Sequence, residues 1–101
     1  MKSTIRTAGD GVELILDGRF TFADHAQFRQ DVDEICGLPG RHCLVDLSAV
    51  SYMDSAAVGM LLLIRERVET KGGHVSLRGG SPPVKDLIRI AKLGSVFTIL
   101  D

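Results

Sequence analysis

Residues 44–59 have the sequence LVDLSAVSYMDSAAVG, and this stretch decides the fold. Residues 43–47 are nearly all apolar, which is typical of a strand that is buried on both faces of a parallel sheet. A short turn is expected next, and a helix is predicted from Ser55 to about Thr70, where a Lys-Gly-Gly sequence ends it. A hydroxyl therefore stands at the start of an apolar helix, where free backbone N–H groups can hold a phosphate.

Two strands and a helix are predicted before this stretch. Residues 12–16 are rich in branched apolar side chains, and a glycine turn at 9–11 lets them pair with residues 4–7. Gly18 is expected to end the second strand. The sequence Thr21-Phe22-Ala23-Asp24 fits a capping box and predicts a helix to about Cys36. Its core-facing residues would be Phe28, Val32 and Ile35.

One strand, one helix and a last strand are predicted after it. Residues 74–78 alternate in polarity, Ser81-Pro82 is a favourable helix start, and Gly94 is expected to end that helix. Residues 96–100 predict the final strand. The order β-β-α-β-α-β-α-β predicts parallel strands with helical crossovers after an antiparallel hairpin. We therefore expect one α/β domain over residues 1–101, with a mixed β-sheet that helices partly cover.

Composition narrows the classes of function. A chain of 101 residues suits one domain, and its 12 basic and 13 acidic residues give a net charge of −1, which does not favour nucleic acid as a partner. The sequence lacks both an apolar run long enough for a membrane span and an apolar signal segment at its start, so a cytoplasmic protein is expected. Cys36 and Cys43 are expected to be reduced and buried rather than joined in a disulfide.

Catalytic and metal-binding patterns are not found. The three histidines lack metal-ligand spacing, no serine–histidine–aspartate arrangement is indicated, and the paired glycines lack the lysine of a phosphate-binding loop. We therefore expect no enzyme activity, catalytic residue, cofactor or metal. A basic set at helical spacing, Lys85, Arg89 and Lys92, is either a solvated face or a docking face for an acidic partner.

Position alone leaves the roles of Ser55 and Asp54 open. A serine before an apolar helix is most often an N-cap, whose oxygen accepts from a first-turn N–H. The alternative is a switch, because a phosphate at this position is compatible with the helix dipole. Asp54 either caps the helix, lies in a solvated turn, or orients the serine or a kinase-bound metal; capping or a turn is favoured.

The helix after Ser55 has two apolar sides. One is predicted to face the core and carries Val58, Leu61, Leu62 and Val68, with Ala57 and Ile64 at its flank. The other carries Ala56, Met60, Leu63 and Arg67. This second strip is either covered by another element or exposed for a partner. We favour a partner surface because the strip begins beside Ser55.

Several segments resemble STAS domains, and among them the anti-sigma factor antagonists, over nearly the full length. The family has a strand ending in Asp-(Leu/Phe)-Ser, then Asp-Ser-(Ser/Thr)-Gly-Leu-Gly at a helix start; here these are residues 46–48 and 54–59. Residues 71–75 and 93–99 also resemble the family pattern. Ala56 and Ala57 replace the second hydroxyl and the glycine, so Ser55 is the only phosphoacceptor within the motif.

This resemblance implies a function. In the family, the serine after the aspartate is phosphorylated by a serine kinase that is also an anti-sigma factor, and phosphorylation releases that partner. The resemblance implies that Ser55 is phosphorylated, that ATP belongs to the kinase, and that a PP2C-type phosphatase acts on phospho-Ser55. The partner-binding residues expected here are Asp54, Ser55, Ala56, Gly59, Met60, Leu63 and Arg67. The alternatives are a non-switching STAS scaffold or subunit of a regulatory or transport assembly, and a small enzyme with Ser55 as nucleophile, for which no base is in view.

Overall fold

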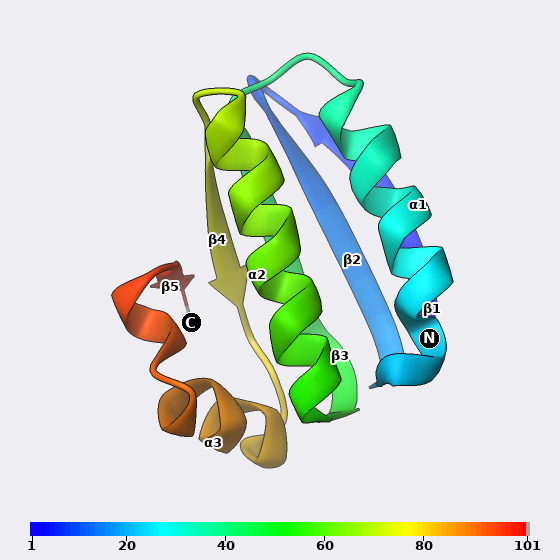
Figure 1. The fold of residues 1–101 in the computed structure, drawn as a ribbon, viewed down its shortest axis with the longest axis vertical. Helices are drawn as coiled ribbons and strands as arrows, with labels where there is room; N and C mark the ends of the chain where they lie inside the picture. Colours follow the sequence, from blue (N-terminus) through cyan, green and yellow to red (C-terminus); the bar gives the residue numbers. More distant parts are fainter. Residues whose placement is uncertain (101) are drawn as a thin grey trace.

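The computed structural model describes residues 1–100, and the predicted order of strands and helices is confirmed (Figure 1). The strands are β1 (Lys2–Ala8), β2 (Gly11–Phe20), β3 (His42–Met53), β4 (His74–Arg78) and β5 (Thr98–Leu100). The helices are α1 (His25–Cys36), α2 (Ser55–Thr70) and α3 (Pro82–Ile90), with 3₁₀ turns η1 (Phe22–Asp24) and η2 (Leu93–Ser95). No helix of residues 1–100 has the length and apolar character that a membrane crossing requires.

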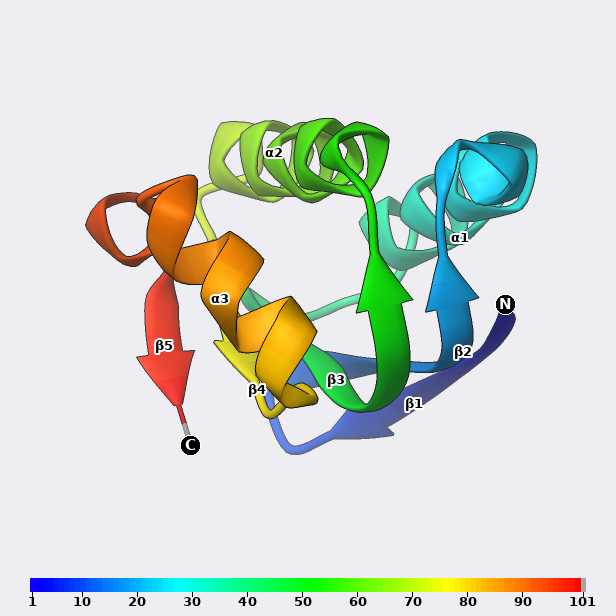
Figure 2. The ribbon, with the colours of Figure 1, turned by 90° about the horizontal axis from the view of Figure 1, so that it is seen from below.

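The five strands form one mixed sheet in the order β1-β2-β3-β4-β5. β1 and β2 are an antiparallel hairpin, whereas the pairs β2/β3, β3/β4 and β4/β5 are parallel, as the sequence predicts. α1 and α2 lie side by side on one face of the sheet, and α3 lies at the end where β2 and β3 finish (Figures 1 and 2). The chain is therefore a two-layer α/β domain with an extra helix at the carboxyl end of its parallel strands.

The core lies between the sheet and the layer formed by α1 and α2. The predicted core residues Phe28, Val32 and Ile35 are buried, and Phe28 packs against Phe20 with ring centroids 5.1 Å apart. In β3, Cys43, Val45 and Leu47 are buried while the residues between them are only half-buried. The expectation that this strand is buried on both faces is therefore wrong, because within residues 1–100 helices cover only one face of the sheet.

Three predicted boundaries are also wrong. β2 does not end at Gly18; it continues to Phe20, and Gly18 has a φ of 101° beside a shift in the register with β3. Residues 48–53 are not a turn, because β3 extends to Met53 along the second half of β2. Gly94 does not end α3, which stops at Ile90; it lies in η2 instead.

Candidate functional site

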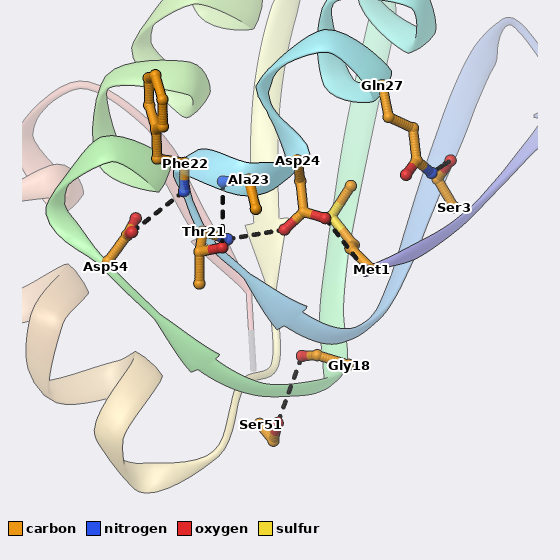
Figure 3. Close-up of polar contacts among 10 residues, drawn as sticks. All are labelled: Met1, Ser3, Gly18, Thr21, Phe22, Ala23, Asp24, Gln27, Ser51 and Asp54. Carbon is orange, nitrogen blue, oxygen red and sulfur yellow. Dashed lines mark hydrogen bonds and ion pairs between the residues drawn. The ribbon is translucent and has the colours of Figure 1, made fainter.

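Asp54 joins the end of β3 to the start of α2 and is the N-cap of that helix. Its Oδ1 accepts from the N–H of Ala57 at 2.9 Å. Its Oδ2 accepts from the N–H of Phe22 in η1 at 3.1 Å (Figure 3). The backbone adds a third connection, because the N–H of Asp54 donates to the Phe20 carbonyl at 3.3 Å. One carboxylate thus stabilises the first turn of α2 and fixes the position of the preceding 3₁₀ turn.

Ser55 is the first residue of α2 and is exposed. The alternative in which its hydroxyl caps the helix is wrong, because Asp54 has that role; the capping role favoured for Asp54 is confirmed. Within residues 1–100 the Ser55 hydroxyl makes no hydrogen bond, and the N–H groups of Ser55 and Ala56 have no backbone acceptor. A phosphate on this hydroxyl would therefore replace no hydrogen bond of Ser55 and would lie next to two free donors at the positive end of the helix dipole.

The turn before α1 supplies two exposed rings beside this site. The Thr21 capping box is confirmed: the Ala23 N–H donates to Thr21 Oγ1 at 3.3 Å, and the Thr21 N–H donates to Asp24 Oδ2 at 2.9 Å (Figure 3). It holds η1 so that Phe22 is 67% exposed, with its ring stacked on His25 at a centroid distance of 5.7 Å. Sequence reasoning missed Phe22, although an aromatic residue next to a capping threonine was a visible signal.

The two sides of α2 differ from their predicted roles. Met60 is only 5% exposed, so its predicted place on an exposed partner surface is wrong. Ala56, Leu63 and Arg67 are half-buried, and Arg67 donates to Asp33 of α1 at 3.0 Å, because α1 packs along this side.

The outward side of α2 is instead a stripe at helical spacing: Ser55, Gly59, Leu62, Glu66 and Glu69 are all exposed. Leu62, a predicted core residue, is 39% exposed, and Val58 is half-buried; Leu61 and Val68 are buried as predicted. We call Ser55, Gly59, Leu62 and Phe22 the Ser55 face. Among the predicted site residues, the structure therefore leaves Ser55 and Gly59 exposed.

A second polar group lies where β3 and β4 run side by side. Arg78 donates to Asp46 Oδ2 at 3.1 Å, and the Ser48 N–H donates to Asp46 Oδ1 at 2.9 Å. Burial tends to raise the pKa of Asp46, but the bonds from Ser48 and Arg78 outweigh it and hold this pKa below its ordinary value. The group is an internally satisfied ion pair, which indicates a structural role.

The remaining candidates are the two cysteines and the histidines of β3 and β4. Cys36 and Cys43 are free thiols, as predicted; Cys43 is buried, but Cys36 is only half-buried, so its predicted burial is wrong. Burial raises the pKa of the Cys43 thiol to about 12. His42 and His74 are register partners on β3 and β4, with rings 4.1 Å apart. No cluster of three or more metal-ligating side chains occurs in the described part of the chain.

The sequence matches a known domain family over nearly its full length. The family model described as "Mlab, STAS domain" matches residues 3–100. A STAS-domain containing protein of Pseudomonas aeruginosa (strain UCBPP-PA14), PA14_20770, is 36% identical over 101 residues, which are 98% of this chain and 99% of that protein.

Solved structures share the fold. A putative anti-sigma factor antagonist from Thermotoga maritima matches with a TM-score of 0.88 at 20% identity, over 98% of this chain and 86% of that one. The anti-sigma factor antagonist SpoIIAA matches in its unphosphorylated form with a TM-score of 0.76 at 18% identity, over 99% and 88% of the two chains. The phosphorylated form of the same Bacillus protein matches with a TM-score of 0.74 at 19% identity, over 99% and 92%.

Proposed function

The chain belongs to the STAS domain family, and from this premise we propose that it is an anti-sigma factor antagonist controlled by phosphorylation of Ser55. In this proposal it is a protein-binding module and not an enzyme. Unphosphorylated, it binds a kinase-type anti-sigma factor through the Ser55 face and so frees the target of that factor. Phosphorylation by the same partner weakens the complex, and a PP2C-type phosphatase restores it.

The observation that carries the proposal is the free hydroxyl of Ser55. Because Asp54 caps α2, a kinase can modify Ser55 without removing a hydrogen bond made by the Ser55 hydroxyl. Two relatives in fold are named as anti-sigma factor antagonists, and one of them has been solved in phosphorylated and unphosphorylated forms. Those names support the proposal by analogy of fold.

The chemistry explains how a phosphate would weaken binding. A phosphoserine carries a charge of about −1.5 to −2, and Asp54 already places a carboxylate beside it. Leu62 and Phe22 are apolar and exposed, so a partner that covers them would also remove water from the phosphate. An unpaired charge buried in an interface costs at least about 2 kcal/mol, which is about 30-fold in Kd.

The direct test is phosphorylation by purified kinase-type anti-sigma factors with ATP, followed by mass spectrometry. We expect one phosphate per chain, on Ser55, and none on the Ser55→Ala variant. A stoichiometric phosphate on any other residue would refute the proposed site.

Binding of the kinase then tests the switch. Ser55→Ala is expected to bind like the wild type and Ser55→Asp at least about 10-fold more weakly. The matched control is Gln30→Glu, which adds the same charge on an exposed position of α1 and is expected to bind normally. Equal binding by Ser55→Asp and Ser55→Ala would favour a non-switching STAS scaffold or a subunit of a regulatory or transport assembly.

A further inference from the structure

A hollow of about 560 Å³ lies between α3, η2 and β5, at the opposite edge of the sheet from β1. Its apolar lining is Ile88, Ile99 and Leu100. Ile88 is buried, whereas Ile99 and Leu100 keep 43% and 41% of their surface exposed. Figure 2 shows α3 crossing the end of the sheet next to β5, with α1 and the β1 strand on the far side. Covering these side chains would remove apolar surface from water, so the hollow is suited to an apolar ligand.

Positive charge gathers on the same lining. Lys85, Arg89 and Lys92 all border the hollow, and no acidic side chain within residues 1–100 lines it. Arg89 has a long ion pair of 3.4 Å with Asp86, in which both side chains are mostly exposed. Within the same residues no ion pair involves Lys85 or Lys92. The whole chain has a net charge of −1, so this concentration of cations is a local feature.

We propose that this hollow binds a single-chain anionic amphiphile of the fatty-acid class. The alkyl chain would lie against Ile88, Ile99 and Leu100, and the carboxylate would lie between the cations of α3 and Lys92. The volume is within the range of about 300–1,000 Å³ that is usual for small-molecule sites, and such sites combine an apolar lining with a few convergent polar groups. A purely polar anion would leave the apolar lining uncovered, and a cationic amphiphile would be repelled by the rim.

The test is titration of the purified protein with sodium decanoate, kept below its micelle-forming concentration and followed by amide chemical shifts. We expect saturable shifts confined to the hollow, with Gly94 and Leu100 among the affected amides. Dodecanoate is expected to bind about 15-fold more tightly, because each buried CH₂ contributes about 4-fold. Decyltrimethylammonium, which has the same chain length and a positive headgroup, is expected to bind at least 10-fold more weakly than decanoate.

Variants separate a real site from surface adsorption. Lys85→Glu/Lys92→Glu is expected to weaken decanoate binding by about 10-fold or more, since two favourable contacts become repulsive. Lys2→Glu/Arg29→Glu makes the same change in net charge on exposed residues of β1 and α1 and is expected to bind normally. If the first pair impairs folding, Ile99→Gln removes apolar lining at an exposed position and is also expected to weaken binding.

Four results would overturn the proposal: shifts that do not saturate below the micelle concentration, no dependence on chain length, equal binding of the cationic amphiphile, or unchanged binding by both lining variants. Shifts in this hollow with an acidic amphipathic peptide but none with decanoate would overturn it as well, and would assign the surface to a protein partner.

Discussion

Replacing Asp54 by alanine tests the geometry on which the proposed switch depends. The substitution removes the N-cap bond to Ala57, which is typically worth about 1 kcal/mol, and the bond to Phe22, worth about another 1 kcal/mol. We therefore expect Asp54→Ala to lower the free energy of unfolding by about 2 kcal/mol. In a domain of this size that corresponds to a fall in Tm of about 8–16 °C.

Ser55→Ala is the matched comparison, because it removes a hydroxyl at the adjacent position that makes no hydrogen bond within residues 1–100. Alanine is the better helix former by about 0.5 kcal/mol, so this variant is expected to be as stable as the wild type or slightly more stable. Asp54→Asn keeps an acceptor oxygen but loses the charge, and its stability should lie between the two.

Urea unfolding of the three variants at neutral pH measures these differences. With an m-value of about 2 kcal/mol/M, Asp54→Ala should shift the midpoint by about 1 M, and Ser55→Ala by less than about 0.3 M. The reasoning would be refuted if Ser55→Ala were the more damaging change. In that case the hydroxyl would be the cap, and phosphorylation would have to break it.

Three further predictions concern single positions. Gly59→Ala, on the exposed side of α2, should stabilise the protein by about 1 kcal/mol, since an added Cβ meets nothing within 4 Å. Gly73→Ala should instead destabilise it by more than about 2 kcal/mol, because its Cβ would overlap the Arg41 carbonyl oxygen. Thermal unfolding of both variants checks these two predictions. Burial raises the pKa of Asp31 above 3.8, so the protonated carboxyl favours folding, and this advantage is lost as the pH rises through the raised pKa. Asp31→Asn should therefore be more stable than the wild type at pH 7. A lower Tm of the variant at that pH would contradict the direction of the pKa shift. Because the pKa of the Cys43 thiol is raised to about 12, iodoacetamide at pH 8 should leave Cys43 unmodified until guanidinium unfolds the protein. Peptide mass spectrometry of the folded protein against an unfolded control tests this.

The order of elements was predictable because each has a local signal, but the extent of β3 was not. Residues 48–53 contain small and polar side chains, and only Val50 and Met53 among them are buried, so strict alternation is lost. What keeps this segment extended is its pairing with residues 17–20 of β2, across register shifts around Gly18. That pairing joins positions about thirty residues apart, which no local pattern specifies.

The prediction of which side of α2 faces the core was wrong for a related reason. Its sequence has apolar residues on two sides, and periodicity shows that both exist without showing what covers each. The sheet takes one side and α1 takes the other, so Met60 is buried and Leu62 is left partly exposed. The ion pair between Arg67 and Asp33 is largely exposed and adds little, so the burial of Met60, Leu61 and Ile64 sets this arrangement.

The position of Asp54 explains why one phosphate would alter more than one point on the surface. Its two carboxylate oxygens connect the start of α2 with η1, which carries the exposed ring of Phe22. A phosphate on Ser55 would place a like charge about 4 Å from this carboxylate, a repulsion of about 1 kcal/mol or more per unit charge in water. This repulsion is comparable with the net strength of the single hydrogen bond to Phe22, but small compared with the free energy that the buried core contributes to folding. The charge would therefore loosen the aromatic part of the Ser55 face while the fold stays intact, and a partner that needs Phe22 and Leu62 together would lose both its fit and its electrostatic match.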